Sequence, residues 1–267
     1  MFANYHTHTF RCRHATGTER AYIECAIARG VRVLGFSDHA PYLFPAGHYS
    51  SFRMTPDQLD EYCTTLCDLR REYQGQIELH IGLEMEYYPA HFFDTLEWMR
   101  DYPIEYLLLG QHFLGNEYDA PYSSAAHTES DLRRYADQTI AAVQTGCFTY
   151  FAHPDLIHYP ANDEIYRSEM RRICECTKEN RIPLELNLLG LSEHRAYPNA
   201  AFWPIAREVG CDVVVGCDAH RPDAVANPDH LRQANTYLGE MGLSPRTEVP
   251  LRNPFHDMAH QPERGTR

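Results

Sequence analysis

The stretch Val31-Arg32-Val33-Leu34-Gly35-Phe36-Ser37-Asp38-His39 joins an apolar run to a pair of side chains that bind protons and metal ions. Residues 31–37 follow the helix-stopping Gly30 and are rich in β-branched and other apolar side chains, which predicts a buried strand. The strand leads directly into an aspartate and a histidine. The same arrangement recurs along the chain, and it decides the fold that we expect.

Buried strands alternate with helical patterns over most of the chain. Besides residues 31–37, the expected strands are one that ends near Tyr5 and those at 77–83, 106–110, 147–152, 183–188 and 213–216. The expected helices cover residues 18–29, 55–72, 92–100, 130–145, 165–179, 202–209 and 230–241, with Thr18 and Ser130 as N-terminal caps. Seven successive βα units with continuously apolar strands predict an α/β protein with a parallel sheet that closes into a barrel. A doubly wound open sheet is the alternative.

The chain shows one domain and no linker rich in glycine or serine. We expect that domain to span residues 1–254 and to be followed by a polar, flexible tail at 255–267. The length of 267 residues suits a single (β/α) barrel.

Six of the expected strands lead into potential metal ligands. These are His6 and His8, Asp38 and His39, Glu84, His112, His153, and Asp218 and His220. The carboxyl ends of the strands of a (β/α) barrel converge on one face, so these side chains should meet in one bowl. Two residues that are two apart on a strand share a face, which makes each His-x-His or Asp-x-His pair a potential chelate.

Each of these motifs has an ordinary interpretation when it is taken alone. His153 could be a turn histidine, and Glu84 could be one partner of an ion pair. Convergent imidazoles and carboxylates without a cation would leave buried polar groups unpaired, so the whole set favours a metal centre. Glu84 could bridge two cations there, and mixed imidazole and carboxylate ligands suit Zn, Mn or Fe.

These residues resemble the polymerase-and-histidinol-phosphatase (PHP) superfamily of metal-dependent phosphoesterases. The resemblance spans about residues 4 to 220 and rests on these motifs in order: His6-Thr7-His8-Thr9, Ser37-Asp38-His39-Ala40-Pro41, Gly82-Leu83-Glu84, His112-Phe113, Ala152-His153-Pro154 and Cys217-Asp218-Ala219-His220. It implies a distorted (β/α)7 barrel with two to three divalent transition metal ions at the carboxyl ends of the strands.

The resemblance also implies how the ligands are shared. One ion would take His6, His8, Glu84 and Asp218; a second would take Glu84, His112 and His153; a third would take His14, His39 and His220. Glu84, Asp218 and His220 are the residues that we expect to act directly in catalysis.

Within the superfamily the chain is most similar to the histidinol-phosphate phosphatase branch. The similarity lies in His153-Pro154-Asp155-Leu156, in the segment 186–190 and in Arg195-Ala196-Tyr197-Pro198. It implies hydrolysis of L-histidinol phosphate to L-histidinol and phosphate, a step of histidine biosynthesis, by metal ions and without a serine or cysteine nucleophile.

Four residues are candidates for binding this substrate. Arg195 has a planar guanidinium that suits phosphate oxygens. Arg53 and His48 belong to an aromatic loop at residues 40–55 that could cover an imidazole ring. His158 stands where the branch often has a basic residue after His-Pro-Asp.

The composition of the chain narrows the classes of partner and cellular location that remain. The net charge of -13 argues against a nucleic-acid partner, because phosphate backbones are held by Lys and Arg. Nine scattered cysteines predict reduced thiols, and the sequence has neither a signal peptide nor an apolar run of about 20 residues. We therefore expect a cytoplasmic enzyme with a small-molecule phosphate ester as its partner and no membrane contact; the sequence leaves open whether it is a homo-oligomer.

Three alternatives remain open from the sequence. The first is a PHP phosphoesterase that acts on another small phosphate ester or on a nucleotide. The second is an amidohydrolase-type barrel, which usually has eight strands and often a bridging lysine at the fourth; here the fourth strand leads into Gln111 and His112. The third is a non-catalytic metal-binding barrel, which a phosphatase assay with metals restored would separate from the others.

Overall fold

The computed structural model describes residues 1–160 and 162–256 and contains a seven-stranded parallel sheet in the order β1-β2-β3-β4-β5-β6-β7. The strands are β1 (Ala3–Asn4), β2 (Val33–His39), β3 (Glu78–Met85), β4 (Tyr106–Leu109), β5 (Tyr150–Phe151), β6 (Leu184–Asn187) and β7 (Val213–Gly216). Every neighbouring pair is parallel, so each connection must cross back over the sheet. The predicted seven βα units are confirmed.

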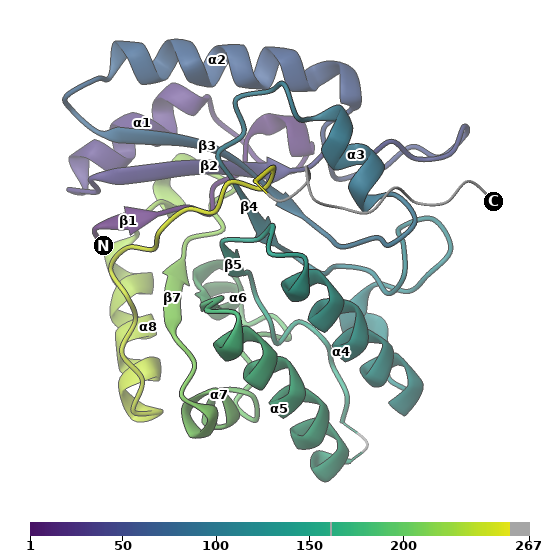
Figure 1. Cartoon of the computed structure of the whole chain (residues 1–267). Helices are drawn as coiled ribbons and strands as arrows, with labels where there is room; N and C mark the ends of the chain where they lie inside the picture. Colours follow the sequence, from purple (N-terminus) through teal and green to yellow (C-terminus); the bar gives the residue numbers. More distant parts are fainter. Residues whose placement is uncertain (161, 257–267) are drawn as a thin grey trace.

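Helices surround the strands, as Figure 1 shows. They are α1 (Glu19–Ala28), α2 (Leu59–Glu72), α3 (Phe92–Trp98), α4 (Glu129–Gln144), α5 (Asp163–Glu179), α6 (Leu188–Glu193), α7 (Trp203–Val209) and α8 (Pro228–Glu240). Helices α4 and α5 pack side by side, and α7 packs against α5.

The segments that follow the first and last strands close the barrel. Thr7 and Ala219 form a parallel bridge, and the amide of His8 donates to the carbonyl of Ala219 at 2.9 Å. The open-sheet alternative is therefore wrong. This closure also brings the His6–His8 pair beside Asp218 and His220, although more than two hundred residues separate them in the chain.

Period-two alternation sorts the strand side chains into two layers. On β4, Leu107 and Leu109 belong to the larger core that packs under the helices, whereas Tyr106 and Leu108 belong to a smaller core inside the barrel. The hydroxyl of Tyr106 donates to the carbonyl of Tyr5 at 2.7 Å. Apolar side chains thus fill the inside of the barrel near the starts of the strands and leave its other end for polar groups.

Two local predictions were wrong. The cap of α4 is Thr128 rather than Ser130: Thr128 Oγ1 accepts from the amide of Asp131 at 3.1 Å, and the Asp131 carboxylate accepts from the amide of Thr128, which completes a capping box. The sixth strand ends at Asn187 instead of residue 188, and the unpredicted helix α6 follows at once. Its start is stabilised because Asn187 Oδ1 accepts from the amide of Gly190 at 2.9 Å.

The packed part of the chain reaches further than residue 254. Phe255 is half-buried against the larger core. Residues 257–267, where most of the expected flexible tail falls, lie outside the described residues. None of the helices described has both the length and the apolar character that crossing a membrane requires.

Candidate metal centre

The structure brings all nine predicted ligands together at the carboxyl ends of the strands. They come from the segment after β1 (His6, His8 and His14), from β2 and β3 (His39 and Glu84), from the segments after β4 and β5 (His112 and His153) and from the segment after β7 (Asp218 and His220). All are buried except His14, which is exposed, and His220, which is partly exposed. The rings of His8 and His220 stack with centroids 4.1 Å apart, and His112 and His153 lie 4.9 Å apart.

The carboxylate of Glu84 lies between two groups of histidines. Its Oε1 atom is 2.8 Å from His153 Nε2 and 3.6 Å from His112 Nε2. Its Oε2 atom is 3.5 Å from the Nε2 atoms of His6 and His8 and 3.0 Å from His39 Nδ1. One carboxylate with its two oxygens directed at separate imidazole groups has the arrangement of a ligand that bridges two cations.

Asp218 provides a second carboxylate on the opposite wall. Its Oδ1 atom lies 3.1 Å from His8 Nε2, 3.5 Å from His6 Nε2 and 3.4 Å from His220 Nδ1. The backbone of Asp218 has a φ of 48°, and that of His153 has a φ of 31°. Such left-handed conformations cost free energy in residues other than glycine, and they persist chiefly where the side chain must be held in a particular place.

Several buried ring nitrogens in this cluster have no hydrogen-bond partner among the described residues: His6 Nε2, His8 Nε2, His39 Nδ1 and His153 Nδ1. A buried polar atom without a partner is costly, so these atoms point to a ligand. On the other side of the rings, His6 Nδ1 lies 2.8 Å from Glu185 Oε2 and His112 Nδ1 lies 2.9 Å from Glu86 Oε1. A histidine that is oriented by a carboxylate and presents its other nitrogen is the usual metal-binding arrangement, so the donor set fits divalent transition metals.

The electrostatics of the cluster favour cations. Burial disfavours the protonated imidazole of His6, but the carboxylates of Glu185 and Asp218 outweigh burial and raise its pKa well above the ordinary value. Burial likewise opposes ionisation of Glu84, yet the imidazoles of His112 and His6 hold its pKa well below the usual range. Because metal ions and protons compete for the same ring nitrogens, positive charge of either kind is favoured here.

Two glycines make room for the carboxylates. A Cβ atom on Gly110 would clash with the Glu84 carboxylate, and a Cβ atom on Gly216 would clash with that of Glu185. Any larger residue at either position would therefore displace a carboxylate of the centre.

Sequence reasoning missed Glu185 and Asn187, which support the ligands, and named Asp38 only as a potential ligand. On β6, Glu185 and Asn187 share one face; Asn187 Nδ2 donates to Glu185 Oε1 at 2.6 Å and to Asp218 Oδ2 at 3.1 Å. Asp38 lies 3.4 Å from His8 Nδ1 and accepts from the amide of Thr9 at 3.2 Å. A glutamate between two leucines of a buried strand, as in Leu184-Glu185-Leu186, was the signal that could have identified the first of these.

Cys12 was also missed. This fully buried residue ends a short 3-10 helix, Phe10–Cys12, beside His14 and His220. Burial disfavours its thiolate, but hydrogen bonds with His14 and His220 outweigh burial and lower the pKa of Cys12 to about 5. No disulfide joins any of the cysteines that the structure describes.

Arg195 borders the centre. It follows α6, its side chain is 43 % exposed, and its NH2 group pairs with Glu193 at 2.8 Å. The neighbouring Tyr197 is buried with its ring 5.3 Å from that of His153. Arg195 Nη1 lies 3.4 Å from the hydroxyl of Tyr197, so Arg195 is close to the bowl while its side chain is partly exposed.

The structure engages Arg53 within the protein, which does not support its predicted role in binding substrate. Its guanidinium is buried and donates to the carbonyl of Ala40 at 2.8 Å, to Glu86 Oε1 at 2.9 Å and to Glu117 Oε2 at 2.8 Å. Since Glu86 also contacts His112, Arg53 helps to orient this candidate ligand. His48 belongs to the same network, because its Nε2 atom lies 3.1 Å from Glu117 Oε1.

His158, another candidate for binding substrate, lies on the surface. It is exposed, and its carbonyl accepts from His127 Nδ1 at 3.3 Å. The two rings lie 5.8 Å apart. Its local partner is thus another histidine on the surface.

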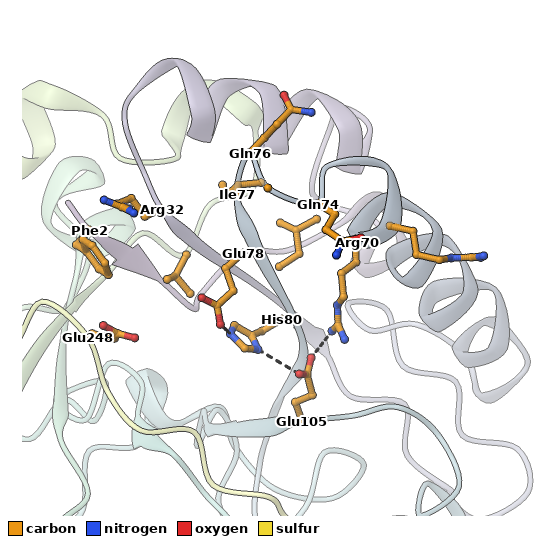
Figure 2. A pocket seen from close by; sticks show the side chains of 14 residues that line it. Phe2, Arg32, Arg70, Gln74, Gln76, Ile77, Glu78, His80, Glu105 and Glu248 are labelled. Carbon is orange, nitrogen blue, oxygen red and sulfur yellow. Dashed lines mark hydrogen bonds and ion pairs between the residues drawn. The ribbon is translucent and has the colours of Figure 1, made fainter.

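A pocket of about 720 Å³ lies at the opposite end of the barrel, lined by Val33 and Glu78 at the starts of their strands (Figure 2). In that pocket His80 lies between Glu78 and Glu105, and Arg70 pairs with Glu105. Its charged groups largely neutralise one another. The cluster at the carboxyl ends, with unpaired ring nitrogens, is therefore the stronger candidate for chemistry.

We expect His80 to make stability depend on pH. Burial disfavours its charged form, but Glu105 and Glu78, at 3.2 and 2.9 Å, outweigh burial and raise its pKa above the ordinary value. A raised pKa in the folded state stabilises the fold below the unfolded pKa, and this contribution is lost as pH rises through the folded pKa. His80→Gln should lower the free energy of unfolding by about 1 kcal/mol near pH 5.5 and by much less near pH 9. Urea unfolding at both pH values measures this, and an equal loss at each would contradict it.

Comparison with known proteins agrees with the geometry. The model of the PHP domain family matches residues 4–188. The chain is 30% identical over 232 residues to the "Probable histidinol-phosphatase" of Deinococcus radiodurans, covering 82% of this chain and 86% of that protein. It is 25% identical to the histidinol-phosphatase of Bacillus subtilis, covering 81% and 92% of the two chains.

Among solved structures, the fold is similar to histidinol phosphate phosphatase from Lactococcus lactis complexed with zinc, L-histidinol and phosphate. The TM-score is 0.71 at 19% identity, covering 93% of this chain and 98% of that one. This agreement confirms the distorted (β/α)7 barrel. The family model matches well over half of the chain, and the matched segment contains seven of the nine candidate ligands. The chain therefore belongs to the PHP domain family.

Proposed function

We propose that the protein is a metal-dependent phosphomonoesterase that hydrolyses L-histidinol phosphate to L-histidinol and phosphate. The observation that carries this proposal is the position of Glu84, whose two oxygens face separate groups of histidines. The relatives named histidinol-phosphatase, which align over most of their length, support the substrate.

Two to three divalent ions, Zn, Mn or Fe, would be held by the nine clustered residues. His6, His8, Glu84 and Asp218 would hold the first, Glu84 with His112 and His153 the second, and His14, His39 and His220 the third. When bound, such ions activate water as a nucleophile and offset the negative charge of the phosphoryl oxygens.

The protein's own side chains hold these ligands in position. Glu185 and Glu86 fix the rings of His6 and His112 and thereby set which nitrogen faces the bowl. Tyr197, which is buried next to His153, limits access of water from that side. In this proposal Glu84, Asp218 and His220 contact the reacting groups.

Arg195 is the residue that we propose for binding the phosphate. Its partner Glu193 is 51 % exposed, and an exposed ion pair of this kind contributes little free energy, so the guanidinium can exchange it for phosphate oxygens. A planar guanidinium can then form two parallel hydrogen bonds with the phosphate.

We expect Arg195→Ala to reduce kcat/KM by about a hundredfold, because charge-assisted contacts with a desolvated anion contribute a few kcal/mol. Arg195→Lys should restore only part of the loss, since an ammonium group cannot form the bidentate contact. Inhibition by free phosphate should weaken in parallel. Steady-state kinetics with product inhibition measures all three effects.

Arg232→Ala is the matched control, because this arginine on α8 is exposed and pairs with the equally exposed Asp229 one turn away. Metal content should be unchanged in both variants. Unaltered kcat/KM and unaltered phosphate inhibition in Arg195→Ala would show that Arg195 is an ordinary solvated loop residue.

The proposed substrate is tested by measuring phosphate release from a panel of small phosphate esters that includes histidinol phosphate. We expect the highest kcat/KM for histidinol phosphate. If another ester in the panel is clearly the better substrate, the proposed phosphatase activity stands and the proposed substrate is wrong. If no ester releases phosphate, the proposed phosphatase activity itself is wrong.

A further inference from the structure

Cys12 lies among metal-binding groups and not in an apolar core. Its sulfur, one ring nitrogen of His14 and one ring nitrogen of His220 all lie within 4.8 Å of one another. The sulfur lies within the same distance of a ring nitrogen of His8 and a carboxylate oxygen of Asp38. The residue is fully buried. A buried cysteine usually serves as a small apolar side chain, but imidazoles and a carboxylate are not the neighbours of such a residue.

The two histidines beside Cys12 direct the same ring nitrogen at each other. His14 Nδ1 lies 2.7 Å from the carbonyl of Cys12, and His220 Nδ1 lies 3.0 Å from the carbonyl of Asp218. A carbonyl oxygen can only accept, so each Nδ1 carries a hydrogen and each Nε2 is turned toward the other ring. The two Nε2 atoms are 2.8 Å apart, a separation at which they share either a proton or a cation.

We propose that the sulfur of Cys12 binds, together with His14 Nε2 and His220 Nε2, a metal ion in the third position of the centre. This inference rests on the proposed function, because it adds a ligand to the same metal centre. Backbone carbonyls orient both imidazoles, as is common for metal-bound histidines.

A sulfur ligand changes which ions this position prefers. Thiolates select soft or borderline ions such as Zn²⁺ and Co²⁺, whereas Mn²⁺ and Mg²⁺ prefer oxygen and nitrogen ligands. The Glu84 side of the centre has only imidazole and carboxylate ligands. The three positions of one centre should therefore differ in metal preference.

Cobalt spectroscopy of the full-length protein tests this directly. The protein is stripped of metal with a chelator, kept reduced, and titrated with CoCl₂. Imidazole and carboxylate ligands give Co²⁺ weak visible d–d bands, whereas a thiolate adds a strong near-ultraviolet sulfur-to-cobalt charge-transfer band. We expect both kinds of band in the unmodified protein, and this result does not depend on any variant folding.

Cys12→Ser should lose the charge-transfer band and keep the d–d bands. Cys63→Ser is the matched control, because Cys63 is a buried cysteine on α2 within the apolar core, and it should keep both. In zinc titrations Cys12→Ser should weaken one binding step by roughly a hundredfold, with little change for Mn²⁺.

The outcomes separate the two proposals. Visible d–d bands without a charge-transfer band in the unmodified protein would overturn the role of Cys12 and leave the metal centre intact. A charge-transfer band that persists in Cys12→Ser would also overturn it. Failure to bind Co²⁺ at all would reject the metal centre and, with it, the proposed function.

Discussion

Glu84→Gln should lower the kcat of phosphate release by about a thousandfold or more, since losing a carboxylate bridge between two cations costs several kcal/mol of charge stabilisation. Glutamine has nearly the same shape, so the space beside Gly110 is still filled. Its neutral amide has one oxygen in place of two equivalent charged ones. It therefore cannot bind, at the same time, one cation held by the imidazole near Oε1 and a second cation held by the imidazole near Oε2.

The loss should be accompanied by a fall in bound metal of about one ion per chain, measured by elemental analysis of the purified variant. Circular dichroism and thermal unfolding establish that the fold is retained. Glu97→Gln is the matched control, because Glu97 on α3 is 54 % exposed and pairs with Arg100. Near-normal turnover together with full metal content in Glu84→Gln would show that Glu84 is not a bridging ligand.

Removing the metals should abolish phosphatase activity, and adding Zn, Mn or Fe should restore it. In the proposed mechanism the imidazoles and carboxylates act on the phosphate ester through the cations that they hold. The purified protein should contain two to three transition metal ions per chain. Prolonged chelation followed by stepwise addition of each metal measures both properties.

Chelation should also lower Tm, because ligands that bind only the folded state stabilise it by mass action. On chelation, the four buried ring nitrogens without a hydrogen-bond partner among the described residues would be left without any ligand. Full activity in protein shown to be free of metal would reject the mechanism. Loss of activity that no added metal restores, with the Tm unchanged, would point instead to damage by the chelation procedure.

Most of the candidate ligands were predictable from the sequence by two rules, whereas His14, which follows the short helix Phe10–Cys12, came only from the resemblance to the PHP family. A strand places alternate side chains on one face, which pairs His6 with His8, and a barrel gathers the carboxyl ends of its strands, which adds Glu84 and His153 to that pair. Neither rule needs the details of packing.

The surroundings of the candidate substrate-binding residues could not be predicted in this way. Arg53 lies in a loop that the sequence shows to be aromatic, and a loop arginine is usually solvated. Its burial is decided by Glu86 and Glu117, which reach it from the segments after β3 and β4. A charge this deep in the protein depends on partners brought from elsewhere in the chain.

The sequence by itself determined the barrel, the face on which its polar groups gather and the identity of the nine candidate ligands. Only the tertiary structure decided which groups orient those ligands and which atoms face one another. The ring of His6 is held by Glu185, 179 residues away in the chain, and the Nε2 atoms of His14 and His220 meet although 206 residues separate them. Periodicity is a property of neighbouring residues, whereas these contacts depend on the register in which the strands close the barrel, and that register is set by the packing of the whole chain.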